Sequence, residues 1–194
     1  MLKKIYATHH SGLAALITKA SNKVLKSYQR PSFLSTVLAT FLLLLVTNNY
    51  AAAKNLEARN AEQYFFAQSF KDFQEERDTV KEEKKQGIFI FFDMVGCPYC
   101  QYMKEKVLNQ EIAQEWYQQN FRSIRVDIHG ATEVIDFDGT ELTESTFSER
   151  YGVFSTPTMI FFDTDGKEIY RHLKMIKTPE RLIVMGEAVL AKNK

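Results

Sequence analysis

The sequence predicts an α/β domain in which helices flank a mixed β-sheet. Three observations predict it. Apolar runs of strand length alternate with amphipathic helical stretches, two Asp-Gly pairs mark tight turns, and the only two cysteines lie where a strand gives way to a helix.

The first 53 residues have the composition of a secretory signal. They hold six basic residues and no acidic one, and an apolar run from 33 to 46 is followed by three alanines, Ala51 to Ala53. We expect cleavage after Ala53. A retained membrane anchor is the second interpretation, although the 14-residue run is shorter than the roughly 20 residues of a spanning helix. The basic lead is long for a signal, and one interpretation places the true start near Val24 or Leu25.

Residues 54–194 are expected to form one domain with a core of its own. This part retains 19 of the 25 basic residues against 24 acidic ones, so it offers no basic stripe for nucleic acid. No repeat and no second, dimerising domain is visible, and we expect a monomer.

Residues 55–86 are charged and favour helix. Ser69, with Asp72 three residues later, resembles a capping box that starts a helix. Residues 81–86 are expected to be its solvated end, and Gly87 its terminator. Three apolar residues recur at near-helical spacing: Phe70, Phe73 and Val80.

The run from Ile88 to Phe92 is apolar on both faces, as in a central strand. A helical stripe follows Cys100, with a break expected near Asn109; it consists of Met103, Val107, Leu108, Ile112 and Trp116. A second strand is predicted by Phe121, Ile124, Val126 and Ile128.

The next part predicts an insert before the third strand. Asp138-Gly139 is a hairpin signal between residues 134–135 and Leu142. A short helix is expected over 143–151. The insert from His129 to Arg150 has two interpretations, a partner-docking surface or an extension of the sheet edge.

The C-terminal part predicts a strand pair and a closing helix. Thr158 to Phe162 is a strong strand, and Asp165-Gly166 turns it into residues 168–171. Thr178-Pro179 then opens a helix that runs through Leu190, since proline is favoured in the first turn.

Cys97 and Cys100 are the candidate catalytic residues. Cys97 is expected at the N-terminus of a helix, where free N–H groups and the helix dipole stabilise a thiolate. Pro98 fits there because its missing N–H has no acceptor to serve, and Tyr99 completes the motif. We expect Cys97 to attack a partner disulfide and Cys100 to resolve the mixed disulfide, with no cofactor.

Two other interpretations of the pair stay open. A zinc site needs about four ligands, and only His129 and His172 accompany the pair after residue 53. A purely structural disulfide would constrain the unfolded chain little, because its loop is so short.

The motif Cys97-Pro98-Tyr99-Cys100, followed by Thr156-Pro157-Thr158 and a Phe-rich hairpin, resembles the thioredoxin fold. The resemblance implies that residues 54–194 form a single thioredoxin-like domain. It also implies that Pro157 is cis, that it lies against the active-site sulfurs, and that the carbonyl of Thr156 docks substrate.

The chain is also similar to the exported SoxW-type thioredoxin-like proteins. The stretches that carry this similarity are Tyr64 to Phe70, Phe91 to Cys100, Val126 to Ile128, Ile135 to Gly139, and Thr156 to Gly166. The likeness covers about residues 60–190.

Two departures from that family bear on function. Ordinary thioredoxins carry a buried Asp six residues before the first Cys, where this chain has Phe91; the nearest acid is Asp93. Asp93 has two interpretations, a proton relay or a solvated strand end, because a carboxylate beside a thiolate opposes its charge. The Pro98-Tyr99 dipeptide matches glutaredoxins, which suggests a more oxidising couple than thioredoxin's.

The function expected from the pair and the resemblance is a periplasmic thiol–disulfide oxidoreductase that reduces protein disulfides, with a membrane thiol protein as its electron donor. A glutathione-linked, glutaredoxin-like activity is the alternative, although Asp163 to Gly166 replaces the glutaredoxin Gly-Gly. A third class is a non-enzymatic protein that binds a partner or copper through the two thiols. Asp136 to Gly139 is expected to be a turn rather than a calcium loop, since the closing ligands are missing. Met159 and Met175 are expected in the packing.

Overall fold

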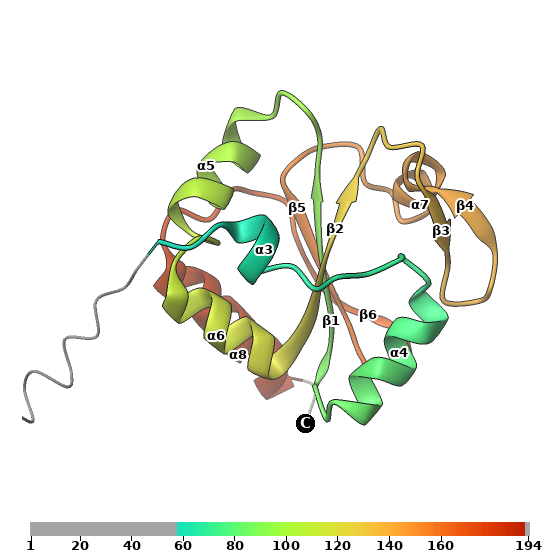
Figure 1. Cartoon of the computed structure of the whole chain (residues 1–194), viewed down its shortest axis with the longest axis horizontal. Helices are drawn as coiled ribbons and strands as arrows, with labels where there is room; N and C mark the ends of the chain where they lie inside the picture. The colour runs from blue at the N-terminus through green and yellow to red at the C-terminus, as the bar shows by residue number, and fades with distance from the viewer. Residues whose placement is uncertain (1–57, 193–194) are drawn as a thin grey trace, which may run out of the picture. The chain divides into compact units, whose positions relative to one another are not determined.

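The computed structural model describes residues 58–192 (Figure 1). The predicted signal segment, its cleavage site and the alternative anchor lie outside these residues. Within the described part, no helix combines the length and the apolar character needed to cross a membrane.

Four strands form the central sheet, in the order β2-β1-β5-β6 (Figure 1). β1 (Gly87–Asp93) is an inner strand that pairs in parallel with β2 (Phe121–Asp127) and antiparallel with β5 (Thr158–Phe162). β6 (Glu168–His172) pairs antiparallel with β5 and forms an edge. The expected mixed sheet is therefore confirmed.

Alternation of side chains along β1 divides the core into two clusters. Phe89 and Phe91 belong to one cluster, whereas Ile88, Ile90 and Phe92 belong to the other. All seven residues of β1 are buried, which explains the continuous apolar run in the sequence.

Different helices cover the two faces of the sheet (Figure 1). The face of Phe89 and Phe91 is covered by α3 (Ala61–Tyr64), α5 (Pro98–Lys106), α6 (Glu111–Asn120) and α8 (Pro179–Lys192). The other face is covered by α4 (Phe73–Glu82), by the hairpin of β3 (Glu133–Ile135) and β4 (Glu141–Thr143), and by α7 (Glu144–Arg150).

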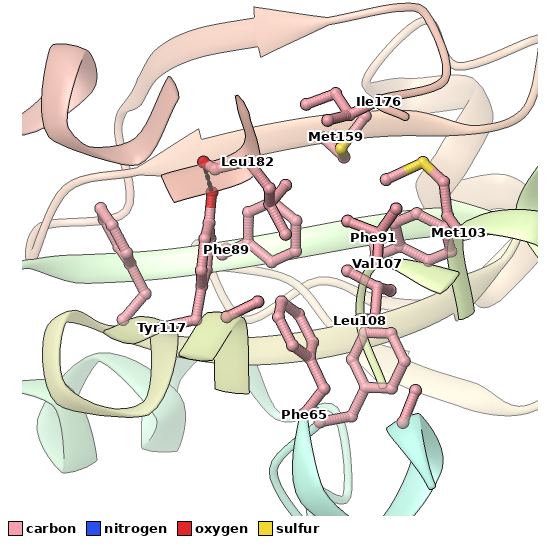
Figure 2. Packing of buried hydrophobic residues seen from close by; sticks show 14 of the residues in the cluster. Phe65, Phe89, Phe91, Met103, Val107, Leu108, Tyr117, Met159, Ile176 and Leu182 are labelled. Atoms are coloured by element: carbon pink, nitrogen blue, oxygen red, sulfur yellow. Dashed lines mark hydrogen bonds between the residues drawn. The ribbon is translucent and has the colours of Figure 1, made fainter. Parts of the chain in front are cut away.

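Aromatic rings fill the first face (Figure 2). The Phe89 ring contacts Tyr117 and Phe161 edge-to-face, with centroids 5.0 and 4.9 Å apart. The Tyr117 hydroxyl donates to the carbonyl oxygen of Leu182 at 2.8 Å, which ties α6 to α8. Burial raises the pKa of Tyr117 well above its ordinary value, so the phenol stays a neutral donor.

The insert is part of the second core cluster. Val134 and Phe147 are fully buried, Phe137 is nearly so, and the Phe147 ring stacks on Phe73 of α4 with centroids 4.9 Å apart. The predicted hairpin and the helix that follows it are confirmed. Met159 is buried and Met175 packs against the first cluster, as expected.

The predicted start of α4 is wrong. Its N-cap is Asp72, whose carboxylate accepts from the N–H groups of Gln74 and Glu75 at 2.9 and 3.2 Å. The hydroxyl of Ser69 instead accepts from the N–H of Lys71. Phe70 therefore precedes the helix, and its side chain is 95% exposed.

The predicted helix terminator is also wrong. α4 ends at Glu82, and Lys84 adopts the left-handed conformation at φ 55°. Gly87 begins β1, and a Cβ at this position would lie 2.1 Å from the carbonyl oxygen of Phe162. Glycine is thus required here by a close backbone approach between neighbouring strands.

The Gly87→Ala substitution should destabilise the chain by about 3 kcal/mol or more, because the methyl group meets backbone that cannot move aside. Gly152→Ala is the control, since Gly152 has φ 64° but no atom within 4 Å of the position that a methyl group would take. It should cost only about 1–2 kcal/mol. Urea unfolding followed by circular dichroism measures both, and equal costs would contradict the argument.

Candidate active site

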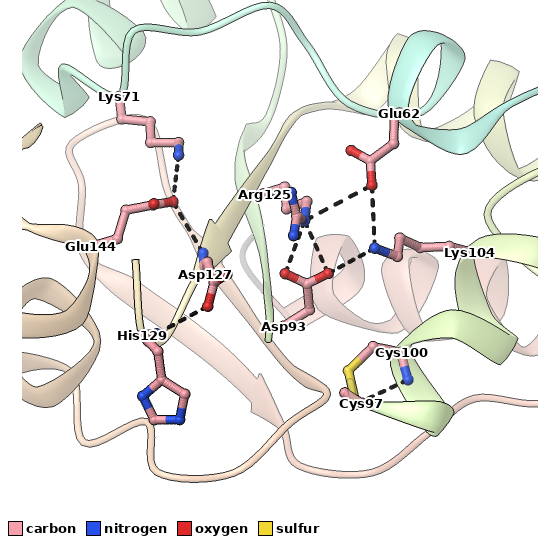
Figure 3. A network of polar contacts seen from close by, with 10 residues as sticks. All are labelled: Glu62, Lys71, Asp93, Cys97, Cys100, Lys104, Arg125, Asp127, His129 and Glu144. Atoms are coloured by element: carbon pink, nitrogen blue, oxygen red, sulfur yellow. Dashed lines mark hydrogen bonds and ion pairs between the residues drawn. A yellow bond between two sulfur atoms is a disulfide. The ribbon is translucent and has the colours of Figure 1, made fainter. Parts of the chain in front are cut away.

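A disulfide joins Cys97 and Cys100 at the N-terminus of α5 (Figure 3). Cys97 is the N-cap, and the N–H of Cys100 donates to its Sγ at 3.1 Å. Pro98 occupies the first helical position, as the sequence predicted. The helix therefore places a backbone N–H where it can stabilise negative charge on the Cys97 sulfur.

The disulfide borders an open pocket of about 440 Å³. Cys97 is 5% exposed and Cys100 1%, so Cys97 is the more accessible of the two. Tyr99 and Val95 beside them are exposed to 59% and 88%. Apolar surface is thus available to a partner next to a disulfide that is nearly covered.

The bond between Thr156 and Pro157 is cis, as the resemblance implied. It directly precedes β5, and Thr158 is paired with Phe92 near the end of β1. β1 leads into the loop before Cys97. The cis bond and the disulfide therefore lie at the same end of the sheet. A docking role for the Thr156 carbonyl stays a prediction.

Asp93, the last residue of β1, is fully buried, so its interpretation as a solvated strand end is wrong. Its carboxylate accepts from the Lys104 ammonium at 3.0 Å and from Nε of Arg125 at 2.9 Å (Figure 3). The burial of this acid depends on these two partners, because an unpaired buried carboxylate is costly.

Glu62 completes a network of two acids and two bases. Its carboxylate lies 3.3 Å from the Lys104 ammonium and 3.9 Å from Nε of Arg125. The four residues come from α3, β1, α5 and β2. The network therefore fixes the active-site helix to the sheet beneath it.

Both cations of the network face the disulfide pocket. Lys104 and Arg125 line it together with Cys97 and Cys100, and Lys104 is one helical turn beyond Cys100. Burial lowers the pKa of the Arg125 guanidinium, but hydrogen bonding to Asp93 and the charges of nearby carboxylates outweigh burial and raise it. The guanidinium therefore stays charged.

The ion pairs of Asp93 explain how a buried acid can lie near a thiolate. A lone carboxylate would oppose the negative charge on Cys97. Here, two cations offset Asp93, and one of them lies on the same helix as the cysteines. The pocket can therefore hold a thiolate beside a buried acid.

The remaining sequence candidates lie elsewhere. Among residues 58–192 no three His, Cys, Asp or Glu side chains are grouped as metal ligands would be. The predicted turn at Asp136 is confirmed, since the N–H of Gly139 donates to the carbonyl oxygen of Asp136 at 2.8 Å. The Asp136 carboxylate accepts from the Tyr151 hydroxyl at 2.8 Å and pairs with Arg150. His129 is exposed, on the loop after β2.

The sequence reasoning missed Lys104, Arg125 and Glu62. The position of Lys104 could have been inferred from the sequence, since a residue four positions after Cys100 shares its helix face. No sequence pattern indicated the position of Arg125 beside β1, because that position depends on the strand register, in which Arg125 pairs with Phe91.

The comparison with protein families agrees with this fold. The family described as "Thioredoxin-like domain" matches residues 73–189. No curated protein matches the chain at a significant level.

Solved structures with a similar fold include a thioredoxin-fold protein from Helicobacter pylori, at 22% identity and TM-score 0.49, covering 56% of this chain and 72% of that one. The C-terminal domain of DsbD from Neisseria meningitidis, in its oxidised form, is 20% identical, with TM-score 0.47 and coverage of 64% and 97%. The DsbH oxidoreductase is 16% identical, with TM-score 0.48 and coverage of 74% and 98%.

The Lys104→Met variant should form the Cys97 thiolate only at a higher pH than the wild-type chain, because a cation that lines the disulfide pocket is lost. The disulfide should also become more reducing. Asp93→Asn should shift both properties the other way, since it leaves the two cations less compensated.

Ultraviolet thiolate absorbance of the reduced chain against pH measures the first effect, and redox equilibration with glutathione measures the second. Lys106→Met is the matched control, because Lys106 is exposed on the same helix. A Lys104→Met titration identical to that of the control would rule out the role of the network.

Proposed function

The chain belongs to the family of thioredoxin-like domains, and we propose that it is a thiol–disulfide oxidoreductase that reduces disulfides of partner proteins. The observation that carries the proposal is the Cys97–Cys100 disulfide at a helix N-terminus, with the Cys100 N–H on the Cys97 sulfur. The cis Thr156–Pro157 bond and the cation-lined pocket support it.

The reaction begins from the dithiol. The Cys97 thiolate attacks one sulfur of the partner disulfide, forms a mixed disulfide and releases the other sulfur as a thiolate. Cys100 then loses its proton and attacks the Cys97 sulfur. The partner leaves with both sulfurs reduced by the two electrons that Cys97 and Cys100 have given up in forming their disulfide. One of its sulfurs is balanced by the proton that Cys100 lost, and the other takes a proton from water.

Asp93 supports the second step as the proton acceptor for Cys100. Its carboxylate holds Lys104, which lies one turn from Cys100 on the same face of α5. This placement supports a proton-relay role for Asp93, with Lys104 as the group between the carboxylate and the helix turn of Cys100.

Export to the periplasm completes the proposal. The basic lead, the apolar run and the alanines before residue 54 support a cleaved signal, with residues 54–194 as the mature domain. A membrane thiol protein would then regenerate the dithiol, and the sequence similarities favour a SoxW-type protein. N-terminal sequencing of the exported chain tests this, and a chain that keeps residues 33–46 would contradict cleavage.

A glutathione-linked activity is the second candidate, favoured by the Pro98-Tyr99 dipeptide. Against it, residues 163–166 stand where glutaredoxins have Gly-Gly. They form a turn in which the N–H of Gly166 donates to the carbonyl of Asp163 at 3.1 Å. The assay with glutathione and hydroxyethyl disulfide separates the two activities. Copper titration of the reduced chain tests the non-enzymatic alternative, which requires stoichiometric binding.

The Cys97→Ser variant should lose insulin reduction down to the uncatalysed rate, because the attacking sulfur is gone. The wild-type chain and a Tyr99→Phe variant serve as active controls, since Tyr99 is exposed and supplies no sulfur. Full activity in Cys97→Ser would overturn the proposed function.

The Cys100→Ser variant should accumulate mixed disulfides with its substrates in cells, because the resolving sulfur is missing. Diagonal gels and mass spectrometry would identify the trapped proteins. Cys97→Ser should trap none of them. Trapping by Cys97→Ser instead would assign the attack to Cys100 and reverse the proposed roles.

A further inference from the structure

A second pocket, of about 660 Å³, lies between α8 and the edge strand β6. Its volume is within the range of small-molecule sites, roughly 300–1,000 Å³. Its lining residues include neither cysteine. This pocket shares no lining residue with the pocket that borders the disulfide.

α8, which forms one wall of the pocket, packs closely on α6. A Cβ at Gly186 would lie 2.4 Å from the Trp116 ring, and the Tyr117 hydroxyl bonds the carbonyl of Leu182. These contacts hold α8 against α6, while its other side faces β6. Val184 on that side is 60% exposed and half-buried Met185 lies next to it.

One face of α8 lines the pocket with basic side chains at its ends and apolar side chains between them. Arg181 lies at one end and Lys192 at the other, eleven residues or about 16 Å apart along the helix. Val184, Met185 and Ala188 lie between them. The face is thus apolar in the middle and cationic at both ends.

The opposite wall repeats this order. Lys167 precedes β6 and Lys177 follows it, and both line the pocket with Ile169 and Tyr170 between them. Lys177 and Arg181 are only four positions apart in the chain, so they lie at the same end of the pocket. Four cations therefore border the apolar floor, and two of them, Lys177 and Arg181, lie at one end.

These cations have no acidic partner within the described range 58–192. No described salt bridge involves any of the four basic residues, Lys167, Lys177, Arg181 and Lys192. Among the same residues, the one acid that lines the pocket is Glu168, which pairs with Arg171 at 2.7 Å. Charge complementarity therefore calls for an anionic ligand.

We propose that this pocket binds an unbranched aliphatic carboxylate, with its chain on the apolar floor and its carboxylate at a cationic end. The aliphatic and methionine side chains of the floor suit a flexible chain, since methionine adapts to irregular shapes. The lysine and arginine side chains at the ends supply charge-assisted hydrogen bonds to a carboxylate.

Calorimetric titration of the purified full chain with dodecanoate, below its micelle concentration, tests the proposal. We expect saturable binding of one molecule per chain. Ala188→Trp fills the floor from an exposed helix position and should weaken binding at least about tenfold. Lys177→Ala combined with Arg181→Ala should weaken it severalfold, because two charges at one end are lost.

Two controls distinguish charge-dependent binding at this pocket from non-specific hydrophobic binding. Dodecanol has the same chain without the charge and should bind more weakly than dodecanoate. Lys106→Ala removes an exposed cation outside the pocket and should leave the affinity unchanged. Insulin reduction by Ala188→Trp should stay at the wild-type rate, which distinguishes a failed pocket from a failed active site.

Three results would overturn the proposal. One is the absence of saturable dodecanoate binding, and another is unchanged binding by Ala188→Trp. The third is a dimer, seen by analytical ultracentrifugation, that Ala188→Trp disrupts. In that case the pocket would be covered by a second copy of the chain.

Discussion

Burial of β1 on both faces is the constraint from which the rest of the structure follows. The strand can be covered on both sides only if helices lie on each face and strands on each edge, since its backbone groups need partners. Where β1 ends, the chain must leave the core. That exit places Cys97 at the start of a helix beside the end of the sheet.

The second consequence concerns charge. Asp93 is the last residue of the buried strand and would be unfavourable there without partners. Lys104 and Arg125 supply them from α5 and β2 and bring positive charge into the pocket of the disulfide. The interaction that stabilises the end of β1 thus also sets the electrostatics around the sulfurs.

The third consequence concerns the far side of α8. Gly186 and Tyr117 hold this helix on α6, and the residues of the edge strand β6 are only partly buried. Packing that completes one core cluster therefore leaves an apolar floor with cationic ends outside it. The disulfide pocket and the α8 pocket differ in chemistry because one lies at a helix N-terminus and the other along a helix side.

The sequence was sufficient for the strands, the break between α5 and α6, the hairpin insert and the CXXC site. Each of these depends on local pattern: apolar runs, helical spacing, Asp-Gly turns and a lone cysteine pair. It failed at the start of α4, where two capping residues compete within four positions. Asp72 is the cap, and Lys71 before it adopts a left-handed conformation that no local pattern indicates.

What the sequence by itself determined is therefore the class of domain and the sulfur pair, because both are written in neighbouring residues. Only the tertiary structure decided the surroundings of Asp93, the reason for Gly87 and the pocket beside α8. Each depends on residues far apart in the chain that strand register and helix packing bring together. Register and packing result from the folded core as a whole, so no single segment encodes them.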